Sequence, residues 1–170
     1  VYGGAAFPVP IGVELDGGTI QTGLWADNAM PTYSGIGVYR QSVPLSAAEA
    51  ERRTELDLGQ VLVAAEVFVN GRSSGVRLAR PFKFDLTGLT REGKNSIEVR
   101  VANTIAPHYT VTNQTLALGP TDSGLLGPVV LRQELPQNEW VAWAKSQVAN
   151  LRQRLGRSTP ELDAAQRLWE

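Results

Sequence analysis

The chain has 170 residues, enough to bury the core of one domain, alone or with an appendage. Its 16 basic and 17 acidic residues leave a net charge of −1 and form no basic run, which argues against nucleic acid and anionic membranes as partners. The lack of cysteine excludes disulfides and thiolate metal sites, and no apolar run approaches the ~18 residues of a membrane-spanning helix.

The first element that the sequence predicts is a strand near the amino terminus. Every second residue from Val9 to Leu15 is apolar, which is the period of a strand with one buried face. Pro8 and Pro10 lack the backbone N–H that a sheet ladder uses, so an edge position is favoured. Residues 25–37 are polar and rich in turn-forming residues, and we expect a loop there.

Two shorter segments lead into the central part of the chain. Residues 38–45 predict the next strand of the fold. The acidic segment 47–51 is long enough for a single helical turn, but we interpret it as a connecting loop between two strands.

The clearest antiparallel pattern lies in the middle of the chain. Apolar residues alternate with other residues over 65–69 and over 97–101, which predicts two central strands. Asn70-Gly71 follows the first of them and is typical of a two-residue hairpin turn, because both positions of such a turn need a positive φ. Between the two strands, residues 82–86 alternate as well and end at a polar corner.

The β-rich part of the sequence ends near Pro136. Residues 103–124 form the longest stretch without a period, and loops of this length inside a domain usually have a function or are disordered. Residues 129–133 predict the last strand. We therefore place a domain boundary after the proline, with residues 1–136 as a β domain and residues 137–170 as a helical extension or linker.

The carboxy-terminal residues predict helices. Apolar residues recur there at helical spacing: Trp140, Ala144, Val148, Leu151 and Leu155. Asn138 is placed to cap the first turn of this helix, and Gly156 is placed to end it. Residues 158–161 carry a proline suited to a first turn, and they predict a second helix that continues to Glu170.

Several short motifs follow one another in a fixed order along the β-rich part. They are Tyr33-Ser34-Gly35, Val38-Tyr39-Arg40, Leu56-Asp57-Leu58-Gly59, Ala65–Gly71, Pro81–Thr87, Gly93-Lys94-Asn95, Val99–Asn103 and Ser123–Val129. In this order and at these spacings, the run from Tyr33 to Leu131 resembles the sugar-binding jelly-roll domain of family-2 glycoside hydrolases. It also resembles the related accessory domain of some bacterial α-L-rhamnosidases.

The resemblance implies a fold and a role. Such domains are mainly β, and they are galactose-binding-like jelly-roll sandwiches of two packed antiparallel sheets. They carry no catalytic residues for glycoside cleavage, and loops from one end of the sandwich pack on a catalytic barrel and sometimes reach the sugar. In family-2 galactosidases an aspartate just before the Ser-Gly element approaches the substrate, and Asp122 occupies a similar place here.

The residues themselves give little support for a catalytic function. Asn138-Glu139 is similar to the Asn-Glu pair of barrel glycosidases, but a barrel needs roughly 250 residues. A helix that begins here, with Asn138 as its cap, is a sufficient explanation of the pair. His108 is the only histidine, and no Gly-x-Ser-x-Gly elbow surrounds a serine. We expect no catalytic residue and no cofactor, with a structural calcium ion as an option. Its candidate ligands are the loop residues Asp16, Asp27 and Asp122.

Sugar binding needs an aromatic face for the pyranose ring and planar polar groups for its hydroxyls. The first loop supplies both in Trp25, Asp27, Asn28 and Tyr33, and the loop over 103–124 supplies them in Tyr109, Asn113 and Asp122. These seven residues are the predicted ligand-binding residues. Packing under the sandwich is the alternative for Trp25, and plain solvent exposure is the alternative for the second loop.

The sequence thus favours a non-catalytic carbohydrate-binding or scaffolding domain of a glycoside hydrolase, with carbohydrate and a catalytic domain as partners. The alternative is a protein–protein interaction module with a docking or dimerising helical tail, and an independent enzyme is a weaker third. Exposed aromatic rings at one loop end would favour sugar, whereas a flat apolar patch would favour protein. Because the first residue is Val1 rather than Met, we expect a mature or excised piece of a longer protein, with an extracellular or periplasmic location.

Overall fold

A computed structural model describes residues 6–8, 12–15, 18–20, 22–108 and 121–155 of the chain. Two compact units are present: the first unit is Ala6–Gln133, and the carboxy-terminal helix belongs to the other. The second helix predicted over 158–170 lies outside the described residues.

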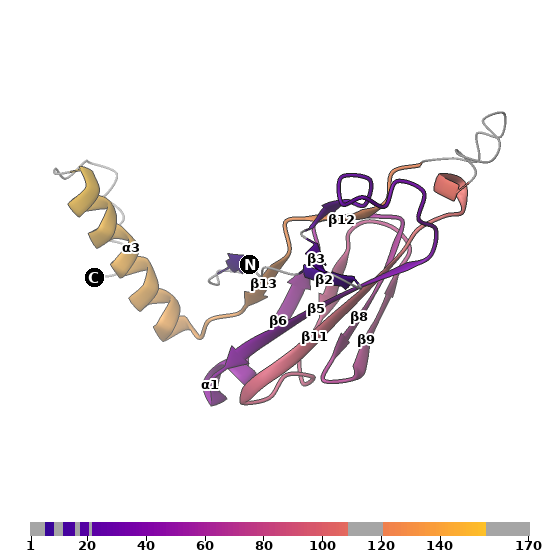
Figure 1. The fold of residues 1–170 in the computed structure, drawn as a ribbon. Coiled ribbons are helices and arrows are strands. Elements are labelled where there is room, and N and C mark those ends of the chain that lie inside the picture. The colour runs from indigo at the N-terminus through magenta and orange to yellow at the C-terminus, as the bar shows by residue number, and fades with distance from the viewer. Residues whose placement is uncertain (1–5, 9–11, 16–17, 21, 109–120, 156–170) are drawn as a thin grey trace. The chain divides into compact units, whose positions relative to one another are not determined.

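Antiparallel strands in three sheets make up the first unit (Figure 1). The six-stranded sheet has the order β3 (Gly18–Ile20), β2 (Gly12–Leu15), β5 (Ile36–Leu45), β11 (Gly93–Ala102), β8 (Ala64–Val69) and β9 (Arg72–Arg77). The four-stranded sheet has the order β1 (Ala6–Pro8), β13 (Val130–Gln133), β6 (Thr54–Asp57) and β10 (Lys83–Asp85). The three-stranded sheet has the order β4 (Gly23–Leu24), β12 (Gly124–Gly127) and β7 (Gln60–Leu62).

One hydrophobic core joins the two larger sheets. The six-stranded sheet contributes alternate residues of β5, β8 and β11: Tyr39, Val43, Leu45, Ala65, Val67, Val69, Ile97, Val99 and Val101. The four-stranded sheet contributes Leu56, Phe84 and Leu131. Because both sets belong to one buried cluster, each sheet turns one apolar face inward, which is why the alternation is visible in the sequence.

The hairpin between β8 and β9 forms where Asn70-Gly71 predicts it. Asn70 has φ 51° and Gly71 has φ 80°, the backbone that a two-residue hairpin turn requires. Strands β8 and β11 lie inside the six-stranded sheet, as their alternation predicts. The sequence did not predict β9, because its residues show no alternation and only the pairing with β8 makes it an edge strand.

Two strands of the four-stranded sheet, β10 and β1, lie near segments for which the sequence predicts strands. Strand β10, which lies in the alternating segment 82–86, pairs with β6 and not with β8 or β11. Strand β1 contains Pro8 and lies at the edge of the four-stranded sheet, where the missing donor costs no bond. The edge position predicted for the strand over residues 9–15 is wrong for its described part, because β2, which holds Val13 and Leu15, lies between β3 and β5.

The acidic segment after β5 is a short helix, α1 (Ala47–Ala50), and the expectation of a plain loop is wrong. A capping box explains it. Ser46 Oγ accepts the Glu49 N–H at 3.4 Å, and Glu49 Oε2 accepts the Ser46 N–H at 2.8 Å. These two reciprocal bonds satisfy donors at the start of the helix, so four residues are enough to form it.

The helix α3 (Gln137–Leu155) confirms the helical period after Pro136. The expected cap at Asn138 is wrong, because the Pro136 carbonyl oxygen already accepts the Trp140 N–H at 2.8 Å and Asn138 lies inside the first turn. Along the predicted apolar stripe, Leu151 is 44% exposed. Within the described residues, no helix combines the length and the hydropathy needed to cross a membrane.

Replacing Gly71 with Val is expected to lower the free energy of unfolding by about 1 to 2 kcal/mol, because a β-branched residue resists a positive φ. A Cβ atom at Gly71 would meet nothing within 4 Å, so the loss reports the backbone conformation alone. Denaturant titration measures the loss, and Gly71→Asn is the control because asparagine tolerates this conformation. An unchanged midpoint for the valine variant would contradict the assigned turn.

Candidate functional site

Three segments of the first unit meet at one end of the six-stranded sheet. Strand β5 begins at Ile36, which pairs with Ala102, the last residue of β11, so the residues before β5 and after β11 leave the sheet together. The Ser123 carbonyl oxygen accepts the Trp25 N–H at 2.8 Å, which joins the segment before β12 to this place. We call residues 25–35, 103–108 and 121–123 the loop end.

The Asn103 side chain links all three segments of the loop end. Its Oδ1 atom accepts the Gly35 N–H at 2.8 Å. Its Nδ2 atom donates to the Tyr33 carbonyl oxygen at 2.7 Å and to Ser123 Oγ at 2.8 Å. The Asn103 N–H also donates to the Gly35 carbonyl oxygen at 3.3 Å. Sequence reasoning placed Asn103 in a motif but not among the site residues, because its three partners are remote in sequence.

Trp25 belongs to the core, and its predicted role as a sugar-stacking surface is wrong. The side chain is 1% exposed, so neither face of the indole is available to a pyranose ring. Its Nε1–H donates to Tyr39 Oη at 2.7 Å, and a Cβ atom on Gly37 would lie 2.5 Å from the indole. Burial raises the pKa of Tyr39, although the bonds from Trp25 and the Leu125 N–H oppose the increase. The packing alternative for Trp25 is thus confirmed.

Of the predicted aromatic residues that the structure describes, Tyr33 is the one at the surface of the loop end, with 39% of its area exposed. Its ring packs edge-on against Trp25, with centroids 5.3 Å apart and planes at 66°. Its hydroxyl donates to the Ile36 carbonyl oxygen at 3.0 Å. The buried indole therefore supports the tyrosine from below and leaves part of the ring open to a ligand.

The predicted polar residues divide into three groups. Asp27 and Asp122 are exposed on two segments of the loop end. Asn28 is half-buried, and its Nδ2 donates to the Leu24 carbonyl oxygen at 2.9 Å, so the amide already has a structural partner. Tyr109 and Asn113 lie outside the described residues. The structure thus brings Tyr33, Asp27 and Asp122 to one end of the unit.

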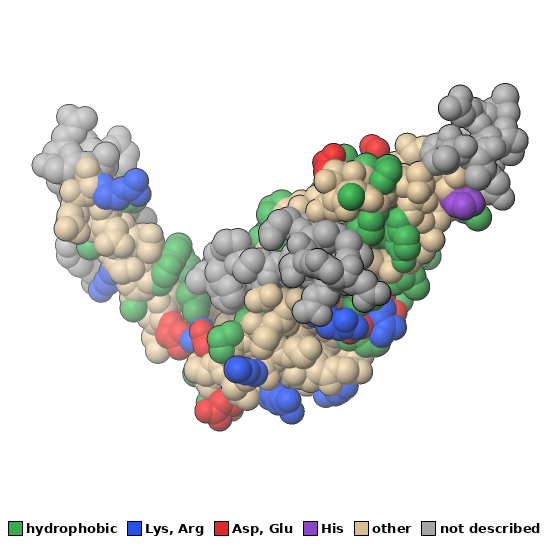
Figure 2. All heavy atoms as spheres, viewed as in Figure 1, with side chains coloured by type: hydrophobic (Ala, Val, Ile, Leu, Met, Phe, Trp, Pro, Cys, Tyr) green, Lys and Arg blue, Asp and Glu red, His purple; other side chains and the backbone are tan. Residues whose placement is uncertain are grey.

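The loop end also has apolar neighbours that were not predicted from the sequence. Ile36, Val63 and Ile105 are 56%, 39% and 55% exposed. The Val63 N–H donates to the Ala102 carbonyl oxygen at 3.2 Å and Ala102 pairs with Ile36, so these side chains border the loop end. Hydrophobic side chains are visible on the surface at this end of the unit (Figure 2). The sequence signal that could have indicated this apolar surface is a large aliphatic residue inside a predicted loop, such as Ile105.

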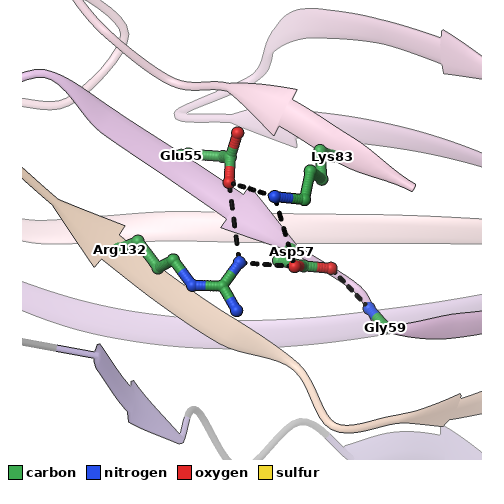
Figure 3. A network of polar contacts seen from close by, with 5 residues as sticks. All are labelled: Glu55, Asp57, Gly59, Lys83 and Arg132. Atoms are coloured by element: carbon green, nitrogen blue, oxygen red, sulfur yellow. Dashed lines mark hydrogen bonds and ion pairs between the residues drawn. The ribbon is translucent and has the colours of Figure 1, made fainter. Parts of the chain in front are cut away.

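A second cluster, of charged side chains, lies on the outward face of the four-stranded sheet (Figure 3). Glu55 and Asp57 alternate with buried residues along β6. Lys83 Nζ lies 3.2 Å from Glu55 Oε1 and 3.8 Å from Asp57 Oδ2. Arg132 Nη1 contacts Asp57 Oδ2 and lies 3.6 Å from Glu55 Oε1. Each carboxylate therefore has two cationic neighbours on adjacent strands, an arrangement that stabilises strand pairing.

This environment lowers the pKa of Asp57. Burial acts to raise that pKa, but the Gly59 N–H, 2.9 Å from Oδ1, and the charges of Arg132 and Lys83 outweigh it. Other carboxyl groups with clearly displaced pKa values follow the same direction: Glu49, Asp85 and Glu98. A glycosidase general acid needs a raised pKa, so none of these four groups suits that task.

The described residues give little support for a metal site or for catalysis by histidine. No group of three or more His, Asp or Glu side chains that could hold a metal ion occurs among them. Asp16, one of the three calcium candidates, lies outside this part of the chain, so the calcium site stays a prediction. The exposed His108 belongs to the loop end, where its backbone N–H donates to Ser34 Oγ at 3.3 Å.

Comparison with known proteins relates the chain to part of large enzymes. No model of a known protein family matches it. A Formosa agariphila protein, provisionally named a β-glucuronidase, is 33% identical over 100 residues, which are 58% of this chain and 8% of that protein. A solved rhamnosidase from Novosphingobium sp. PP1Y is similar over 76% of this chain and 15% of its own, with 29% identity and a TM-score of 0.62.

A more distant likeness concerns the fold alone. A β-glucuronidase structure from Faecalibacterium prausnitzii has a TM-score of 0.59 and 18% identity, covering 77% of this chain and 31% of its own. The chain spans well under half the length of each of these proteins. It is therefore similar to a small, β-rich part of glycoside hydrolases.

Replacing Trp25 with Ala is expected to lower the free energy of unfolding by about 3 to 5 kcal/mol, because it empties a large part of the core. Trp25→Phe keeps an aromatic ring but loses the bond to Tyr39, and its loss should be about 1 to 3 kcal/mol. Chemical denaturation measures both, with Tyr33→Ala as the surface comparison. A loss under about 1 kcal/mol for Trp25→Ala would be inconsistent with the buried position.

Replacing Asp57 with Asn is expected to lower the free energy of unfolding at neutral pH by about 1 to 3 kcal/mol, because Arg132 and Lys83 lose a charged partner. The folded pKa of Asp57 is below its ordinary 3.8, so the stabilisation is present above that pH and is lost as the pH falls through the folded pKa. Denaturation at a series of pH values should show the two proteins converging on acidification. A gap that stays constant from about pH 7 to about pH 2 would refute the role of this charge.

Proposed function

We propose that the chain is a non-catalytic accessory domain of a glycoside hydrolase, which places its loop end beside a catalytic domain and there takes part in sugar binding. The observation that carries the proposal is the collection of exposed Tyr33, Asp27 and Asp122 on segments that one asparagine holds together. On this proposal the catalytic groups belong to polypeptide outside the region that the chain shares with its much longer relatives.

The fold supports an accessory role. Two antiparallel sheets share one core, and we propose that residues 1–136 form a galactose-binding-like jelly-roll sandwich followed by a helical extension over 137–170. The part of the chain similar to the rhamnosidase and glucuronidase structures is about the size of this β region and a small share of each enzyme. A module of that size fits a supporting domain better than a catalytic barrel, which needs roughly 250 residues.

The loop end offers part of a sugar site rather than a complete one. Tyr33 supplies an aromatic ring with a rigid backing, which suits the apolar face of a pyranose. Asp27 and Asp122 supply carboxylate oxygens that accept bonds from sugar hydroxyls. Because Trp25 is buried, Tyr33 is the one exposed ring in the described part of the loop end, and the isolated chain should bind a sugar only weakly.

The exposed aliphatic residues favour a second candidate function, a protein–protein interaction module. Ile36, Val63 and Ile105 have no use in binding sugar hydroxyls, but they suit an apolar contact with protein. Both functions use the same end of the unit. If the loop end only packs against protein, the domain is a scaffold and does not bind sugar by itself.

Titration of the chain with glucuronic acid, rhamnose and galactose distinguishes the two functions. Glucuronic acid and rhamnose correspond to the names of the similar enzymes, and galactose corresponds to the galactose-binding-like fold proposed for residues 1–136. We expect dissociation constants on the order of 1 mM, about 4 kcal/mol, for at least one sugar, with NMR shifts confined to the loop end. Tyr33→Ala and Asp122→Asn should each abolish the shifts.

Two controls sharpen the titration. Tyr33→Phe keeps the ring and loses only the hydroxyl bond to Ile36, so it should bind more tightly than Tyr33→Ala. Lys94→Ala changes an exposed residue at the opposite end of β11 and should bind as the wild type does. If no sugar of the panel perturbs the loop end at tens of millimolar, direct sugar binding is wrong and the scaffolding function remains.

A further inference from the structure

Asn103 differs from the other polar residues of the loop end in the number of segments that it joins. It directly follows β11, and its side chain bonds to Tyr33 and Gly35 on one side and to Ser123 on the other. Ser123 is 6% exposed, and its carbonyl oxygen accepts the Trp25 N–H. The backbone that carries the indole, the exposed tyrosine and the neighbouring Asp122 is therefore held by one carboxamide.

A carboxamide is the one common side chain that satisfies all these partners. The Gly35 N–H needs an acceptor, and the Tyr33 carbonyl oxygen needs a donor. The Ser123 hydroxyl can serve in either direction. A carboxylate supplies acceptors alone, so it would face the Tyr33 carbonyl oxygen without a hydrogen between them. An alanine would leave each of the three groups without this partner.

We propose that Asn103 is the positioning residue of the loop end: it does not touch the ligand, but it fixes where Tyr33 and Asp122 stand before a ligand arrives. This inference rests on the proposed function for its consequence on binding, and on the hydrogen bonds alone for its structural part. Ordering a site in advance reduces the entropy lost on binding, so a site without this side chain should bind more weakly while its contact residues remain intact.

The change Asn103→Asp tests the proposal because it is nearly isosteric and removes only the donor. At neutral pH the new carboxylate still accepts the Gly35 N–H but repels the Tyr33 carbonyl oxygen. Protonation restores a donor at that position, because a protonated carboxyl group carries an O–H. The loop end of the variant should therefore become more ordered as the pH falls, whereas a merely structural loss would not recover.

Two NMR signals report this order without any ligand. The Gly35 N–H donates to Asn103 Oδ1. The Trp25 indole N–H donates to Tyr39 Oη, and the backbone N–H of the same residue donates to the Ser123 carbonyl oxygen beside Asn103. In Asn103→Asp we expect both signals to shift or broaden at pH 7 and to return toward the wild-type positions as the pH falls below about 4, where an ordinary aspartate carboxyl is protonated. For the sugar that binds the wild type, affinity should fall about tenfold at pH 7, the effect of one lost hydrogen bond, and recover in the same pH range.

A matched control comes from the opposite end of β11. Asn70 also uses its amide to donate, to the Leu89 carbonyl oxygen at 3.1 Å and to Asn95 Oδ1 at 2.9 Å. Asn70→Asp should therefore lower stability while leaving the Gly35 and Trp25 signals unchanged. If Asn103→Asp unfolds the chain, Asn103→Ser, which keeps a hydroxyl of both capacities, is the second variant and should show partial loss.

The outcomes separate this inference from the proposed function. Wild-type signals for Gly35 and Trp25 in Asn103→Asp at pH 7 would overturn the positioning role, whatever the sugar result. A shift or broadening of both signals at pH 7 with recovery on acidification supports that role even if no sugar binds the wild type, in which case the sugar-binding function alone fails. Equal disturbance of the two signals by Asn70→Asp would also overturn the inference, because the effect would then be one of general stability.

Discussion

The pairing of β11 with its two neighbours is the constraint on which the rest of the first unit depends. This strand bonds to β5 along its whole length and to β8 over residues 97–102. Its inward residues Ile97, Val99 and Val101 lie in the core, so burial fixes the register: a slip of one residue would expose them all. Because the ladder with β5 holds both ends of β11, Asn95 near its start and Asn103 just after its end can each organise a cluster of turns.

A buried residue, Trp25, supports the exposed side chain of Tyr33 at the loop end. Trp25 contributes nothing directly to a ligand, yet its bond to Tyr39 and its edge-on contact with Tyr33 connect the exposed ring to the core. A ring held in this way loses little freedom on binding, which is the advantage of a rigid platform over a flexible loop. The adjacent aliphatic residues Ile36 and Ile105 add an apolar margin suited to protein.

Charge plays a structural part in this chain. Glu55 and Asp57 are paired across strands with a lysine and an arginine, and these neighbours help to lower the pKa of Asp57. A carboxylate held in this way stabilises the pairing of neighbouring strands. The chain covers only a small share of each similar hydrolase, which is consistent with an accessory domain of a larger enzyme.

The sequence by itself determined the strands β8 and β11, the Asn70-Gly71 turn and the helix α3. Each of these is indicated by a pattern within neighbouring residues, so no tertiary contact is needed to predict it. The capping box of α1 was also readable there and was missed. Of the candidate site, the sequence located Tyr33, Asp27 and Asp122 as residue types in loops. Only the tertiary structure decided that Trp25 is buried and that Asn103 joins three segments, because both depend on contacts between residues far apart in the chain, which no local period records.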